Sequence, residues 1–199
     1  MKVIAISGSR NPAGQTARAT DAFLDGVRDK RGEVEHIFLP QLDIQSCRQC
    51  EDNGWGRCRE EGVCVIEDDF AATRQAVLDA DAWVLVTPVY FGELSECVKA
   101  FADRLRRCNI GAKGEGLKEK PVIGVAAAGG SGRGTATCLL EMDRLFSHIS
   151  AQIADLIAFL RADKVEVRLY DKGFLHAKAY LFHQDEIGAH SRHDRHAQG

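Results

Sequence analysis

The chain has 199 residues, of which 45% are hydrophobic and 28% are charged, and its 26 basic and 29 acidic side chains give a formal net charge of −3. This length suits a single domain built around one hydrophobic core. The near-neutral balance lacks the basic footprint of a nucleic-acid-binding protein, and no apolar run approaches the roughly 20 residues that span a membrane. We therefore expect neither nucleic acid nor a membrane among its partners.

The cysteine count also restricts the class of protein. Seven cysteines are an odd number, and four of them lie between Cys47 and Cys64. The first apolar run, Val3–Ile6, stops at a Ser-Gly-Ser turn and is a strand candidate rather than a secretory signal. Metal or redox chemistry in a reducing cytoplasm is therefore expected rather than a disulfide scaffold.

Short runs rich in Val and Ile alternate along the chain with segments of helical periodicity. Strands of this length that alternate with helices predict a doubly wound α/β fold, in which helices cover both faces of a parallel sheet. The ligands of such sheets bind beyond the carboxyl ends of the strands, so the loops after the strands are candidate sites. The predicted strands are Val3–Ile6, Val34–Leu39, Ala82–Thr87 and Pro121–Ala127, and the predicted helices are Thr16–Lys30, Phe70–Ala80, Glu93–Arg107 and Thr135–Ile149.

The loop after the first strand carries hydroxyl side chains and glycines and leads into the first helix. A helix N-terminus favours an anion, because its first N–H groups lack partners and the helix dipole is positive there. The hydroxyls of Ser7, Ser9 and Thr16 and the guanidinium of Arg10 can donate to a phosphate. The loop is neither a Walker loop nor a Gly-x-Gly-x-x-Gly fingerprint. The alternative is an ordinary turn in which Thr16 caps the helix.

After the second strand, Cys47, Cys50, Cys58 and Cys64 fall within eighteen positions. Four thiolates this close in sequence can surround one metal site, and their softness selects an iron-sulfur cluster or zinc over calcium or magnesium. Free thiols or a redox-active pair are the alternative. The other three cysteines, Cys97, Cys108 and Cys138, lack ligand spacing and are expected to pack in the core.

Two further loops can hold a flat ring. Thr87–Gly92 follows the third strand with two aromatic residues, and Ala128–Gly134 follows the fourth strand with four glycines in seven positions. Backbone N–H and C=O groups in such loops can meet the polar edge of a heterocycle while Tyr90 or Phe91 packs on its face. Taken singly, each loop could be an ordinary turn, but three loops that suit a ligand, each after a strand, favour a binding site.

Together, the segments Ser7–Arg10, Thr87–Gly92 and Gly129–Gly134 resemble the flavodoxin-like NAD(P)H-dependent FMN reductases, especially the branch related to iron-sulfur flavoproteins. The resemblance covers about residues 1–158. It implies bound FMN, NAD(P)H as electron donor, no catalytic nucleophile, and a dimer or tetramer. The implied contacts to the FMN phosphate are Ser7, Ser9, Arg10, Gln15 and Thr16; those to the flavin ring are Pro88, Val89, Tyr90, Phe91 and Gly92; and those to its other edge are Gly129, Gly130, Ser131 and Gly132.

The cysteine spacing departs from this family. In iron-sulfur flavoproteins two residues separate the second and third cysteines, whereas seven residues separate Cys50 from Cys58 here. The spacing of the last two cysteines, and the segment Val65–Phe70 after them, match the family.

The resemblance implies a reaction in which a nicotinamide reduces FMN, which then reduces a quinone, a flavin or another small acceptor. The alternative is an electron-transfer protein that carries FMN, with or without an iron-sulfur cluster, and serves a protein partner without nicotinamide turnover. A flavin-binding relic that acts only as an interaction module is the third hypothesis.

We expect residues 159–199 to form a separate C-terminal appendage. A hairpin is predicted from Lys164–Tyr170 and Phe174–Phe182, followed by a His-bearing tail. Leu175–Phe182 resembles one strand of a phospholipase D domain, with His183 where that family places Asp. A single altered half-site predicts a fused fragment rather than a second enzyme.

Overall fold

The computed structural model describes residues 1–129 and 132–160. The predicted hairpin and tail therefore lie outside the described residues. The described elements are β1 (Lys2–Ser7), α1 (Gln15–Arg28), β2 (Glu33–Phe38), the 3-10 helix η1 (Leu39–Gln41), α2 (Phe70–Asp79), β3 (Ala82–Pro88), α3 (Glu96–Gly111), β4 (Pro121–Ala128), α4 (Thr135–His148) and β5 (Gln152–Leu160).

The five strands form one parallel sheet in the order β2-β1-β3-β4-β5. Residues of β1, β3 and β4 are buried almost without interruption, as expected of central strands covered on both faces. In β2 the first residues alternate between exposed and half-buried, which fits its place at the edge. The predicted flavodoxin-like sheet is confirmed.

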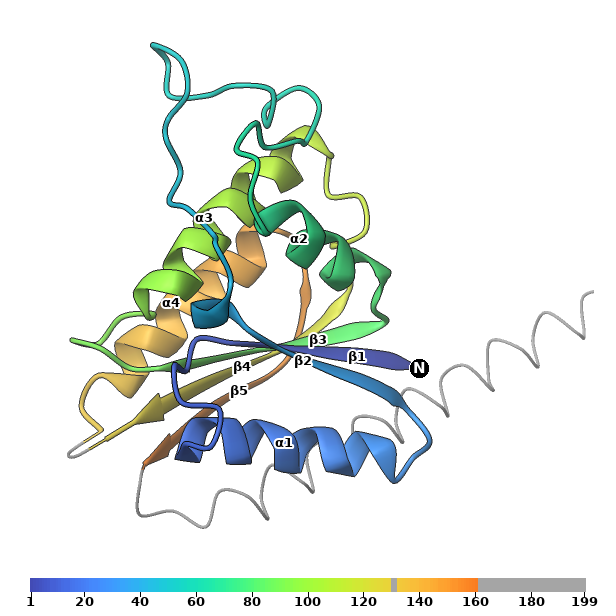
Figure 1. Ribbon diagram of the computed structural model, residues 1–199, viewed down its shortest axis with the longest axis vertical. Coiled ribbons are helices and arrows are strands. Elements are labelled where there is room, and N and C mark those ends of the chain that lie inside the picture. Colours follow the sequence, from blue (N-terminus) through green and yellow to red (C-terminus); the bar gives the residue numbers. More distant parts are fainter. Residues whose placement is uncertain (130–131, 161–199) are drawn as a thin grey trace, which may run out of the picture.

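Helices cover both faces of this sheet, with α1 on one side and α2, α3 and α4 on the other (Figure 1). Each face has its own apolar core. Phe23 and Leu24 of α1 belong to one core with Val84 of β3, while Trp83 belongs to the other and meets Phe146 of α4 edge to face, with ring centroids 5.6 Å apart.

The strand order indicates the edge of the sheet at which a ligand would bind. The chain leaves β1 toward β2 on one side and later returns to β3 on the other, so the connections diverge between β1 and β3. In sheets of this order, the crevice outside the carboxyl ends of the strands at that point is where ligands bind. The loops after β1, β3 and β4 all lie at this edge.

The third helix begins later than predicted. The periodicity of the sequence indicated a start at Glu93, but α3 begins at Glu96, after an extended Ser95, and continues to Gly111. Residues Tyr90 to Glu93 instead close a turn through reciprocal backbone hydrogen bonds of 3.3 and 3.0 Å. The apolar spacing could not reveal this, because Leu94 keeps the helical spacing of apolar residues and is also buried in the turn.

Candidate functional site

The loop between β1 and α1 presents buried hydroxyls and an uncapped helix. Ser7 ends β1 and is fully buried, Ser9 is 8% exposed, and Arg10 is exposed. The N-cap of α1 is Gly14, which offers no side-chain cap, and the first turn holds no acidic residue. Thr16 lies inside the helix, so the predicted alternative of a Thr16 cap is wrong. The helix end keeps the positive potential that attracts a phosphate.

Gly8 links this loop to the start of α3. Its N–H donates to the carbonyl of Val86 at 2.8 Å, and a Cβ at Gly8 would lie 2.3 Å from Ser95 Oγ and 2.6 Å from a methyl carbon of Val98. A side chain here would force the loop away from α3. The glycine therefore brings the loop after β1 against the loop after β3, rather than simply opening space for a ligand.

The turn after β3 projects its aromatic residues outward. Tyr90 is 57% exposed and Phe91 is fully exposed, while the backbone of Phe91 has a φ of 53° and that of Gly92 a φ of 87°. The left-handed conformation costs a residue with a Cβ about 1–2 kcal/mol. Strain of this kind persists where neighbouring contacts fix the backbone, as they do here.

Two polar residues of α4 hold this turn in place. Thr137 Oγ1 donates to the carbonyl of Gly92 at 2.7 Å, and a carboxylate oxygen of Glu141 accepts the N–H of Leu94 at 2.9 Å. The two side chains are one helical turn apart and therefore share a face of α4. Neither was predicted, because nothing local in the sequence pairs α4 with a loop more than 40 residues earlier.

The loops after β3 and β4 also touch directly. A Cβ at Gly134 would lie 2.6 Å from the Cα of Gly92, so only glycine permits this approach. Between the two loops is a cleft of about 440 Å³ lined by residues that include Val89, Gly129 and Arg133. Its size lies within the range of cofactor pockets. Of the residues predicted beside Gly129, Gly130 and Ser131 lie outside the described part of the chain.

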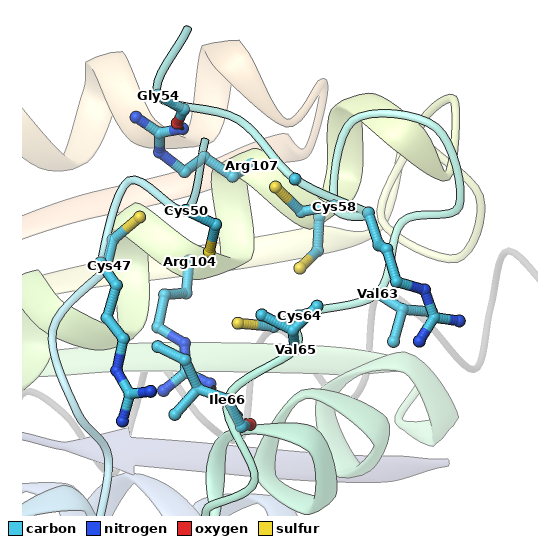
Figure 2. A pocket seen from close by; sticks show the side chains of 14 residues that line it. Cys47, Cys50, Gly54, Cys58, Val63, Cys64, Val65, Ile66, Arg104 and Arg107 are labelled. Atoms are coloured by element: carbon cyan, nitrogen blue, oxygen red, sulfur yellow. Dashed lines mark hydrogen bonds between the residues drawn. The ribbon is translucent and has the colours of Figure 1, made fainter. Parts of the chain in front are cut away.

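The four clustered cysteines line one pocket above α3. Figure 2 shows Cys47, Cys50, Cys58 and Cys64 around a common space, and all four are free thiols. The loop that carries them is built onto the end of α3: a Cβ at Gly111 would lie 2.2 Å from the carbonyl oxygen of Cys58.

Arg104 of α3 anchors both ends of this loop. Its side chain is 1% exposed and forms a bidentate ion pair with Asp68, at 2.6 and 2.9 Å, while Nη1 also donates to the carbonyl of Gln45 at 3.0 Å. Burial raises the pKa of Asp68, but hydrogen bonds from Arg104 and from the N–H groups of Gln45 and Phe70 outweigh it, so this pKa lies below its ordinary value. Burial likewise lowers the pKa of Arg104, and its contacts with Asp68 and Cys64 raise it further than burial lowers it.

The predicted core cysteines behave as expected. Cys108 and Cys138 are buried in the hydrophobic core, and burial raises the pKa of each to about 12. Cys97 is half-buried at the start of α3, with its sulfur 3.4 Å from Ser95 Oγ and 3.7 Å from the carbonyl oxygen of Gly8. It packs against the same core from the side of the first loop.

The cysteine pocket supplies a soft donor set. Within residues 1–129 and 132–160, no three His, Cys, Asp or Glu side chains are grouped so that they could hold one metal ion. Thiolates are ligands for zinc and for iron-sulfur clusters rather than for calcium or magnesium. The donor set, four thiols beside arginines, fits an anionic iron-sulfur cluster.

A family model for NADPH-dependent FMN reductases matches residues 1–179. The chain belongs to this family. It is therefore an oxidoreductase with FMN as its cofactor and NAD(P)H as its electron donor. The match runs past residue 158, and the predicted division at that position stays a prediction.

Individual relatives agree with this assignment. An iron-sulfur flavoprotein of Methanocaldococcus jannaschii is 34% identical over 148 residues, which are 73% of this chain and 72% of the relative. A flavone reductase superposes with a TM-score of 0.68 at 22% identity, over 90% of this chain and 62% of that chain. An archaeal flavodoxin superposes with a TM-score of 0.59 at 15% identity, over 90% and 98%. The two structures show the fold alone.

The described helices include none with both the length and the apolarity to cross a membrane.

Two features of these loops suit FMN. An uncapped helix end suits the phosphate, and the cleft between the β3 and β4 loops, with Phe91 at its rim, suits the ring. FMN supplies the electron transfer when bound, so the protein's own task is to place the ring and exclude competing reactions.

Proposed function

We propose that this reductase oxidises NAD(P)H at an FMN held outside the carboxyl ends of β1, β3 and β4, and passes the electrons to a quinone, a flavin or another small acceptor. The observation that carries the proposal is the convergence of three predicted loops at the point where strand order diverges. Gly8 packs against the start of α3 and Gly134 against Gly92, and this close approach of the three loops supports a single ligand that spans them.

The roles proposed for individual residues follow from position. Arg10 and the start of α1 neutralise the phosphate, and the β3 and β4 loops border the ring. The residues assigned are Ser7, Ser9, Arg10, Gln15 and Thr16 for the phosphate, and Pro88 to Gly92 with Gly129 to Gly132 for the ring.

A second centre is proposed at Cys47, Cys50, Cys58 and Cys64. Their shared pocket, and the name of the Methanocaldococcus relative, favour an iron-sulfur cluster there. The chain would then also serve a redox protein as electron partner. We propose that it acts as a dimer or tetramer in the reducing cytoplasm, a compartment that suits a chain with an odd number of cysteines.

The proposal is tested by an absorbance spectrum of anaerobically purified protein before and after NADPH or NADH is added. Bleaching of bound flavin at turnover rates supports the reductase. Reduction by dithionite but by neither nicotinamide would instead support the electron carrier, and failure to rebind FMN would refute both.

The phosphate site has a separate test. Arg10→Gln should weaken FMN binding several-fold and leave riboflavin binding unchanged, because riboflavin lacks the phosphate. Arg18→Gln, on the exposed side of α1, is the matched control. Equal losses for both flavins would exclude Arg10 as a phosphate contact.

A further inference from the structure

Arg104 has a donor that nothing in the described fold accepts. Both terminal nitrogens of its guanidinium are engaged, by Asp68, by the carbonyl of Gln45 and by the carbonyl of Ile66 at 3.4 Å. The Nε–H has no partner among the described residues, although the side chain is 1% exposed. A buried donor without an acceptor costs about 1–3 kcal/mol, so such donors are rare and call for an explanation.

The guanidinium lies between an aromatic ring and the cysteine pocket, with its Cζ 4.2 Å from the centroid of the Phe70 ring. Arg104 lines the cysteine pocket, and Cys64 lies beside its guanidinium (Figure 2). Asp68, the carboxylate paired with Arg104, occupies the terminal nitrogens and fixes the plane of the group. The bidentate pair therefore orients Nε, which a flexible ammonium could not achieve.

We propose that the Nε–H of Arg104 donates a hydrogen bond to the sulfur centre at its Cys64 corner and thereby raises the reduction potential of that centre. This inference rests on the proposed iron-sulfur site. Reduction adds one electron to the cluster, and a nearby cation and N–H donor stabilise the added negative charge. Arg104 is a positioning residue that tunes the cluster and is not one of its ligands.

A second arginine offers a matched comparison. Arg107 lies on the same helix and lines the same pocket, but it is half-buried, donates to the carbonyl of Gly54 at 2.7 Å and lies over the ring of Trp55. Arg104→Lys and Arg107→Lys both keep the positive charge. Only the first removes a buried donor that lacks a partner among the described residues.

The test is a dithionite redox titration of the cluster, followed by EPR, after anaerobic reconstitution of the full-length protein with iron and sulfide. Arg104→Lys should shift the reduction equilibrium about tenfold toward the oxidised form, which is a midpoint about 59 mV more negative for one electron. Arg107→Lys should shift it by less than a third of that. Equal midpoints for Arg104→Lys and the wild type would overturn the inference.

A readout on the wild type avoids any folding defect in the variant. Protein labelled with ¹⁵N-arginine should show a nitrogen coupled to the reduced cluster in pulsed EPR, and absence of that coupling would refute the hydrogen bond. Wild type that takes up no iron would remove both the proposed cluster and this inference. Bleaching by NADPH tests the flavin function separately.

Discussion

Asp68 is a carboxylate without solvent contact whose charge is balanced inside the fold. Its side chain is fully buried, and its oxygens accept hydrogen bonds from Arg104 and from the N–H groups of Gln45 and Phe70. It therefore joins the two ends of the cysteine loop to α3. A buried ion pair of this kind is costly to break, because the remaining charge has no partner.

We predict that Asp68→Asn lowers the free energy of unfolding by about 3–5 kcal/mol, because it leaves Arg104 buried without its counter-ion. The control is Asp103→Asn, which removes an exposed ion pair with Lys99 one helical turn away and should cost at most about 0.5 kcal/mol. Urea unfolding followed by circular dichroism measures both. Similar losses in the two variants would show that the buried ion pair contributes no more to stability than the exposed one.

The carboxylate of Asp68 also makes the stability of the folded chain depend on pH. The pKa of Asp68 is lower in the folded chain than the unfolded value of about 3.9, so its contribution is complete above that value and is lost as the pH falls through the native pKa. Between pH 5 and pH 2, the wild type should lose more stability than Asp68→Asn. Urea titrations at fixed pH steps measure the two slopes, and parallel slopes would contradict the assignment.

At the scale of elements, α4 acts as a support for the loop that borders the flavin. Thr137 holds the carbonyl of Gly92 and Glu141 holds the N–H of Leu94, so the strained turn at Phe91 is fixed on its C-terminal side. The loop conformation is therefore set before any ligand binds. Preorganised loops of this kind bind more tightly, since the ordering cost is already met.

We predict that Thr137→Val weakens FMN binding about three- to tenfold, because it removes one hydrogen bond worth about 0.5–1.5 kcal/mol from the loop. Thr137→Ser keeps the hydroxyl and should bind as the wild type does. Fluorescence titration of the apoprotein with FMN measures the affinity. Equal weakening of FMN binding by Thr137→Ser and Thr137→Val would show that the hydroxyl of Thr137 does not contribute to the affinity.

The strands and most helices were predictable because their signal is local. Val3–Ile6 and Pro121–Ala127 are short apolar runs with clear ends, and each became a central strand. The start of α3 was mispredicted because a turn held by Glu141 displaced it. Thr137, Glu141 and Arg104 were all missed as site residues for the same reason: their partners are distant in sequence, and only the folded chain brings them together.

For the whole molecule, ligand binding and folding are linked. The phosphate and ring loops belong to β1, β3 and β4, the buried centre of the sheet, so FMN should bind only the folded chain. We predict that FMN at 100 times its dissociation constant stabilises the protein by about 2.7 kcal/mol, which raises Tm by about 5–10 °C at this size.

Differential scanning calorimetry with and without FMN measures this shift, with riboflavin as comparison. A smaller shift with riboflavin would reflect the missing phosphate contacts at α1. An unchanged Tm with FMN would argue that the ligand site is not part of the folded core.

The third helix ties the two proposed centres together. At its start, the N–H of Ser95 donates to Thr87 Oγ1 at 3.0 Å beside the flavin loop, and at its end Gly111 packs under Cys58. Arg104 stands nine residues after Ser95, roughly 14 Å along the axis. The helix thus sets both the distance between the two proposed sites and the direction in which Arg104 leaves the helix axis. One residue inserted between Ser95 and Arg104 would rotate Arg104 by about 100° away from the cysteine pocket, while the start of the helix at the flavin loop stayed in place.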